Sequence, residues 1–126
     1  MMTPFQQMLS FRELLTHTRD DIKYFDKHAQ KTPFNKGQRY AAWCVVNEFK
    51  GVVPLIIRES RINSAKIDEA QNIIHFLREK IEFYRNKTNR TTNTAKESEF
   101  NGIITYLNNV ISCVDYILSD DGEYIE

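Results

Sequence analysis

Few residues of this chain combine the type and the spacing that chemistry at an active site requires. None of the histidines, His17, His28 and His75, has a Glu at the Glu-x-x-His spacing of di-iron helical bundles. Cys44 and Cys113 are too few for a zinc site, and both fall in helical patterns, which predicts two buried, reduced thiols. The four glycines are isolated and form no phosphate-binding loop. The sequence therefore predicts no catalytic site, no metal site and no cofactor.

One pair of residues, Arg12 and His17, has the spacing Arg-x4-His. This spacing resembles the motif of HEPN ribonucleases, which are also small helical bundles. The resemblance implies that both side chains would approach the scissile phosphate of an RNA. Here the pair lies in the first predicted helix, whereas the family usually carries it in later helices. The residue after the arginine is the acidic Glu13, where a polar residue is usual, so a HEPN-like ribonuclease is kept as a minor alternative.

Basic residues gather on the third predicted helix and just after it. Arg78 and Arg85 are seven positions apart and so share one helix face, and Lys87 and Arg90 extend the positive charge into the predicted loop. Tyr84 is the best-placed ring for stacking on a base. This basic ridge (Arg78, Tyr84, Arg85, Lys87, Arg90) predicts, as an alternative function, a nucleic-acid-binding accessory protein. A pI near 6.8 argues against strong nonspecific binding to DNA.

The end of the chain is acidic. Residues 97–126 hold seven Asp and Glu and no Lys or Arg, although the whole chain has a net charge of zero. Two interpretations are open. In the first, these acids pair with the basic helices or face water. In the second, the basic ridge contacts a phosphate backbone or an acidic protein, and the acidic tail (119–126) contacts a partner elsewhere. Aromatic residues outside the apolar stripes are further anchors for a protein partner. The candidates for protein interaction are Phe5, Phe34, Asp120, Asp121, Glu123 and Tyr124.

Apolar residues at three-four spacing define the elements that carry these side chains. Residues 8–29, 67–84 and 100–117 each show one such stripe, which is typical of amphipathic helices packed lengthwise. Residues 40–49 are apolar over a wide arc that includes Tyr40 and Trp43, which predicts the most buried helix. The predicted fold is all-α, an antiparallel up-and-down bundle of about four helices, with the second kinked or broken near Gly51 and Pro54.

Capping patterns and chain breakers predict the helix boundaries. Residues 86–93 contain no apolar side chain and predict an exposed, mobile loop, whereas residues 55–61 would form a short helix or a bent continuation of the second helix. A strand over 52–57 would have no partner. The predicted caps are Thr3 with Gln6, Asn35 with Gln38, Asn63 or Ser64, and Thr94 with Glu97.

The length of 126 residues predicts a single helical-bundle domain, 1–126, with a short acidic tail over 119–126. The N-terminus has no signal-peptide pattern and no apolar run could span a bilayer, so we expect a cytoplasmic protein without a membrane partner. The leading prediction is a non-enzymatic protein-binding module: an adaptor, an accessory subunit or a small inhibitor of a larger complex, such as one encoded by a phage or mobile element. Heptad stripes that continue across a two-fold axis make a homodimer an option.

Overall fold

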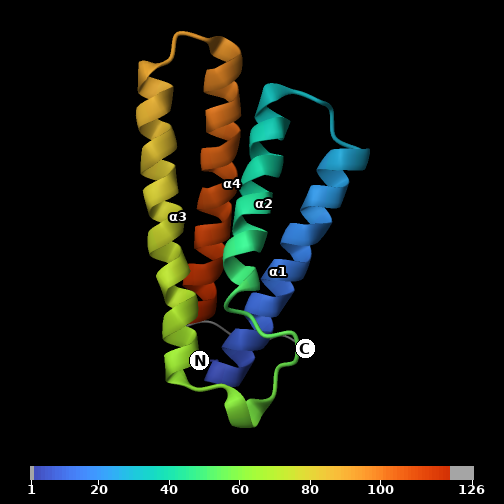
Figure 1. The fold of residues 1–126 in the computed structure, drawn as a ribbon, viewed down its shortest axis with the longest axis vertical. Coiled ribbons are helices and arrows are strands. Elements are labelled where there is room, and N and C mark those ends of the chain that lie inside the picture. The colour runs from blue at the N-terminus through green and yellow to red at the C-terminus, as the bar shows by residue number, and fades with distance from the viewer. Residues whose placement is uncertain (1, 120–126) are drawn as a thin grey trace.

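Four long helices make up the computed structural model, which describes residues 2–119 (Figure 1). They are α1 (Pro4–Lys27), α2 (Pro33–Lys50), α3 (Ser64–Arg90) and α4 (Thr94–Leu118), and a one-turn 3-10 helix, η1 (Glu59–Arg61), precedes α3. Successive long helices run in opposite directions. The structure thus confirms the all-α class and the four-helix bundle, and the described residues contain no strand.

The bundle is arranged around α4. In Figure 1, α3 and α2 lie on either side of α4, and α1 packs against the outer side of α2. The most extensive contact joins α2 and α4, which run in the same direction, and the next joins α3 and α4. At the lower end of the view, the side-chain amide of Gln7 donates a 3.2 Å hydrogen bond to the backbone carbonyl of Ile117, so the start of α1 meets the end of α4.

The predicted apolar stripes form the core. Phe11 of α1, Phe49 of α2, Leu77 of α3 and Leu107 of α4 are all fully buried. The rings of Phe11 and Phe49 lie 5.9 Å apart between their centroids. Removing these side chains from water stabilises a fold of this kind more than any other interaction, since apolar burial is worth about 25 cal/mol per Å².

A glycine on each helix allows α2 and α4 to come close together. A Cβ atom added to Gly37 would overlap the backbone carbonyl of Glu99, and one added to Gly102 would overlap that of Phe34. The two glycines therefore permit direct contact between the backbones of α2 and α4. This contact fixes where the outward-facing side chains of α2 stand relative to those of α4.

Threonine followed by proline begins both α1 and α2. The Thr3 hydroxyl accepts from the Gln6 amide and the Gln6 side chain accepts from the Thr3 amide, which confirms the predicted capping box. The predicted cap at Asn35 is wrong, because the Thr32 hydroxyl accepts a 3.2 Å hydrogen bond from the Asn35 amide instead. The residue before a proline favours the extended conformation that an N-cap needs, so Pro33 sets the start of α2.

The prediction of a loop over residues 86–93 is wrong, because α3 continues to Arg90 and only residues 91–93 connect it to α4. The ammonium group of Lys87 lies over the rings of Phe83 and Phe100, 4.8 Å and 5.9 Å from their centroids. The Thr88 hydroxyl donates to the backbone carbonyl one turn earlier, at 2.9 Å. The Lys87 contact with Phe100 ties this polar end of α3 to α4, although the segment lacks an apolar stripe.

The start of α4 also lies one position earlier than predicted. The side-chain carbonyl of Asn93 accepts a 3.0 Å hydrogen bond from the Lys96 amide, so Asn93 is the N-cap and Thr94 is already in the helix. The predicted box of Thr94 with Glu97 is therefore wrong, because Asn is among the strongest N-cap residues. At α3, the predicted cap at Asn63 is confirmed, with a 3.2 Å bond from the Lys66 amide.

The predicted break after the second helix is confirmed. α2 ends at Lys50 with Gly51 as its C-cap, so α2 has no bent continuation. The connection over residues 51–63 contains η1 as its one regular element. Within this connection Val53 is buried, whereas Leu55 and Ile56 are exposed.

Candidate protein-binding surface

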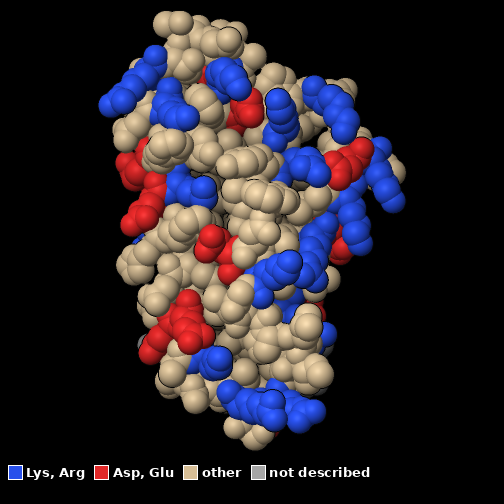
Figure 2. Space-filling view, viewed as in Figure 1, with Lys and Arg blue, Asp and Glu red and all other residues tan. Residues whose placement is uncertain are grey.

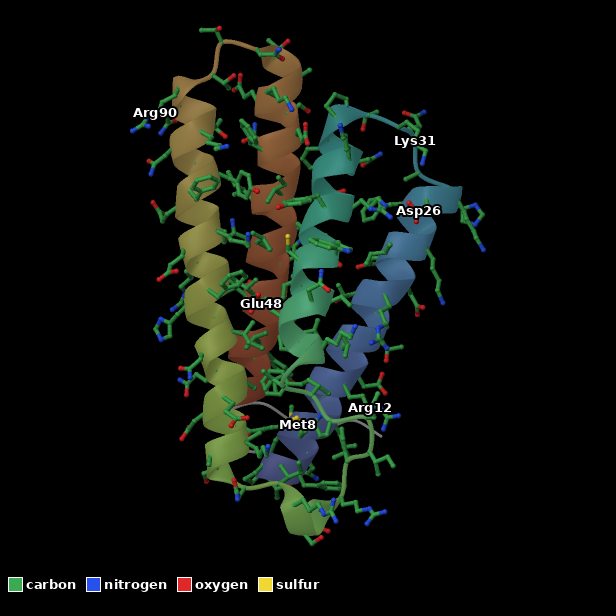
Figure 3. All side chains as sticks on the ribbon, in the orientation of Figure 1. Met8, Arg12, Asp26, Lys31, Glu48 and Arg90 are labelled. Carbon is green, nitrogen blue, oxygen red and sulfur yellow. The ribbon has the colours of Figure 1, made fainter. Side chains whose placement is uncertain are left out.

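The Arg12 and His17 pair lies on the exposed side of α1. Both side chains are exposed, and Figure 3 shows Arg12 pointing away from the bundle. Within residues 2–119, no three His, Cys, Asp or Glu side chains form a group that could hold a metal ion.

The basic ridge is largely paired within the protein. Arg78 lies 3.7 Å from the carboxylate of Asp115 on α4, and Arg85 lies 2.9 Å from that of Glu82 on α3. Arg90 points outward from the upper end of α3 (Figure 3). The Arg78 pair joins the basic helix to the acidic helix, whereas the Arg85 pair lies within α3. A paired arginine offers less charge to a phosphate.

Tyr84 is not available for stacking on a base. Its side chain is 9% exposed, because it follows the apolar stripe of α3 into the core. Burial, and after it the neighbouring Tyr40, raises the pKa of the Tyr84 phenol well above its ordinary value. The exposed ring at this position is that of the preceding residue, Phe83.

A continuous series of aromatic rings crosses α2, α3 and α4, and we call it the aromatic strip (Tyr40, Trp43, Phe83, Tyr84, Phe100). At its α2 end, the rings of Tyr40 and Trp43 stack with centroids 6.2 Å apart and planes inclined by 26°. Their exposed fractions are 39% and 51%. The edge of Tyr40 then meets Tyr84 at 6.4 Å, which joins α2 to α3.

The α3 end of the aromatic strip carries a cation. Phe83 is 53% exposed, packs edge-on against Tyr84 at 5.1 Å, and lies beneath the ammonium group of Lys87. Tyr84 also contacts Phe100 of α4 at 5.7 Å, so the buried middle of the strip rests on the central helix.

The sequence did not identify this surface, because Tyr40 and Trp43 belong to the apolar arc of residues 40–49. Tyr40 and Trp43 are three positions apart and share one helix face, while Ala41 and Val45 of the same helix are buried. Part of the predicted apolar arc of α2 therefore faces outward and is not covered by the other helices. The width of the arc indicated this, because an apolar arc wider than one packed helix stripe cannot be buried entirely against neighbouring helices.

The other candidates for protein contact lie elsewhere. Phe5 and Phe34 are half-buried, in the first turns of α1 and α2, so each offers only part of its ring to a partner. The four acidic and aromatic candidates of the tail lie outside the described residues; they are Asp120, Asp121, Glu123 and Tyr124.

The two cysteines differ in exposure. Cys44 is buried, as predicted, but Cys113 is exposed, so the prediction of two buried thiols is wrong for Cys113. Cys113 is exposed although Val110, one turn before it, and Val114, the next residue, are both buried.

None of the helices within residues 2–119 has the length and apolar character needed to cross a membrane. Comparisons with models of protein families, with curated proteins and with solved structures find no match to this chain.

Proposed function

We propose that this chain is a non-enzymatic protein-binding module that recognises its partner through the aromatic strip. The observation that carries the proposal is the exposed, stacked pair of Tyr40 and Trp43. Trp and Tyr are the residues most enriched among those that dominate binding energy at protein interfaces. A module of this size would act as an adaptor, an accessory subunit or a small inhibitor of a larger complex.

The strip is also organised before a partner binds. Trp43 packs on Tyr40, Tyr40 on Tyr84, and Phe83 on Tyr84, so each exposed ring is held by a neighbour. Ordering side chains at an interface costs about 0.5–1.5 kcal/mol for each rotamer-rich side chain. Rings that are already ordered avoid much of that cost, which favours tight binding from a small surface.

The test is an affinity pull-down from native cells, treated with nuclease, followed by measurement of Kd with the purified partner. We expect a stoichiometric protein that the Trp43→Ala variant binds at least about tenfold more weakly, as expected for a residue that dominates an interface. Tyr24→Ala is the matched control, since Tyr24 is 56% exposed on α1, outside the strip. Unchanged affinity of Trp43→Ala for the captured protein would contradict the proposal.

A second candidate function is the binding of single-stranded nucleic acid at the α3 end of the aromatic strip. The observation that favours it is the exposed Phe83 ring with Lys87 over it and Arg90 one turn further along. A base stacked on such a ring contributes about 1–3 kcal/mol, and cations nearby would contact phosphates.

This candidate is tested by fluorescence anisotropy with single-stranded RNA and DNA oligonucleotides at several salt concentrations. It requires affinity that falls steeply with salt and that Phe83→Ala and Lys87→Gln each reduce. Arg78→Gln is the matched control, because Arg78 pairs with Asp115 and should contribute little. Binding that is equal in Phe83→Ala and the unchanged protein would eliminate this candidate.

A further inference from the structure

The connection between α2 and η1 carries the most exposed large apolar side chains of the described residues. Leu55 and Ile56 are consecutive and are 88% and 70% exposed. They lie in the loop at one pole of the bundle, the lower end in Figure 1. The other exposed large apolar side chains are all aromatic and stand on the sides of the helices.

We call Leu55 and Ile56 the apolar tip. The residues before and after the tip in the chain pack against the core and so fix how it projects. Val53, two positions before Leu55, is 6% exposed and belongs to the core, and its amide donates a 2.8 Å hydrogen bond to the carbonyl of Phe49. After the tip, Ile57 and Ile62 pack against the same core. The loop is thus held at both ends, while the two aliphatic side chains between them remain in water.

Cations lie beside the apolar tip, Leu55 and Ile56. A hollow of about 410 Å³ beside it is lined by Lys50, Arg61 and Lys66 together with apolar side chains, and none of the lining residues within 2–119 is acidic. Arg58 is exposed in the same connection, and so is one acidic residue, Glu59. Figure 2 shows Lys and Arg side chains gathered at this pole of the molecule. We call these four residues the basic collar (Lys50, Arg58, Arg61, Lys66).

We propose that this pole docks on the surface of an anionic membrane, with Leu55 and Ile56 entering the boundary of the acyl chains and the basic collar facing lipid phosphates. Interfacial binding of this kind combines buried apolar area with attraction to anionic lipids. Each methylene moved into the bilayer strengthens binding about fourfold, and each cation near the surface about fivefold. The sequence predicted no membrane partner because it contains no segment that could span a bilayer. A loop that docks on the membrane surface needs no such segment.

Two features favour a bilayer over a protein as the partner of this pole. The tip is a pair of protruding aliphatic side chains, and leucine is under-represented among the residues that dominate protein interfaces. Lys50, Arg61 and Lys66 of the basic collar line the hollow beside the tip, so they would reach headgroups once the tip inserts. In this orientation the aromatic strip, on the sides of the helices, stays free for the protein partner proposed above.

The test is sedimentation of the full chain with vesicles of phosphatidylcholine alone and of phosphatidylcholine with about one third phosphatidylserine. We expect binding to the anionic vesicles that weakens with salt, and at least about tenfold weaker binding of the double variant Leu55→Ser with Ile56→Ser. Arg58→Gln with Arg61→Gln should also bind more weakly. Trp43→Ala is the matched control and should bind vesicles as the unchanged protein does, since Trp43 lies outside this pole.

Three outcomes would overturn the proposal: no binding to anionic vesicles, equal binding to neutral ones, or equal binding by the Leu55 and Ile56 double variant. Both side chains are exposed, so that variant should fold, and circular dichroism melting checks that it does. If the protein does not bind vesicles and the double variant instead no longer binds a protein that the unchanged chain captures, the pole is a protein contact and the membrane proposal is wrong. The result with Trp43→Ala then still tests the aromatic strip separately.

Discussion

Gly37 of α2 and Gly102 of α4 both lie where the two helices come closest, and neither position has room for a methyl group. A Cβ on either residue would overlap a backbone carbonyl of the opposite helix, and a backbone cannot turn aside as a side chain can. The most extensive helix contact of the bundle therefore depends on two residues without side chains.

Replacing either glycine by alanine should destabilise the fold. Alanine favours a helix by about 1 kcal/mol over glycine, but overpacking of a tight contact costs about 1–3 kcal/mol or more. We expect Gly37→Ala and Gly102→Ala each to lower the free energy of unfolding in urea by about 2 kcal/mol. Gly51→Ala is the control, because its Cβ would meet no atom closer than 4.0 Å, and equal effects at Gly51 and Gly37 would contradict this account.

The second prediction concerns the side-chain hydrogen bond that joins Tyr106 of α4 to Asp21 of α1. The Tyr106 hydroxyl donates to the carboxylate of Asp21 at 2.6 Å, and burial followed by this bond raises the pKa of the phenol well above its ordinary value. Tyr106→Phe should lower the free energy of unfolding by about 1 kcal/mol. Tyr24→Phe should leave thermal stability unchanged, since Tyr24 is exposed, and a similar loss in both variants would refute the assignment.

Acid should weaken the contact between α1 and α2. Arg39 donates to the carboxylate of Asp26 at 2.5 Å, and this hydrogen bond lowers the pKa of the Asp26 carboxyl. A lowered folded-state pKa means that the pair contributes stability above the unfolded pKa of about 3.9 and loses it as pH falls through the lower folded value. The effect is small, because both side chains are 44% exposed and salt screens the pair.

This pH dependence can be measured as thermal stability against pH, with Asp26→Asn beside the unchanged protein. The difference between the two proteins should shrink as the pH falls below about 4, and high salt should also reduce it. A difference that stays constant down to strong acid would show that the ion pair is not its source.

Thiol reactivity should separate the two cysteines. Cys113 is exposed and Cys44 is buried, so a thiol reagent should label one thiol of the native protein quickly. The second thiol should react only as fast as the fold opens. In denaturant, both thiols should react quickly. Fast labelling of native Cys113→Ser would show that Cys44 is accessible after all.

The cap of α4 gives a direct test of its observed start. Asn93→Ala removes the oxygen that accepts from the Lys96 amide and should cost about 1 kcal/mol of stability. Thr94→Ala should cost little, because Thr94 is exposed in the first turn. The reverse order of effects in urea unfolding would place the cap at Thr94.

The core could be predicted from the sequence because its signal repeats along each helix. Ile67, Leu77 and Ile81 of α3 all lie on one stripe, and all three are buried. The glycine contact could not be predicted, because a single glycine within a helix looks the same whether it meets solvent or another backbone. Only the packing of α2 on α4 shows that Gly37 and Gly102 have a role in it.

The candidate surfaces were harder to predict, because periodicity separates buried faces from exposed ones and cannot identify apolar residues left in water. Phe83 and Tyr84 are neighbours in sequence, and the ring expected to be available is the buried one. Leu55 and Ile56 belong to the apolar segment of residues 52–57, which is typical of a buried segment; only the packing of Val53 shows which of its residues face the core.

The contact between α2 and α4 also has a consequence for the order of folding. Three residues join α3 to α4, so this hairpin closes a short loop, whereas Gly37 and Gly102 lie 65 positions apart in the chain. Long-range contacts form at a greater cost in loop entropy and therefore later than local ones. We expect α2 to dock on a preformed α3–α4 hairpin, so that Gly37→Ala speeds unfolding much more than it slows folding.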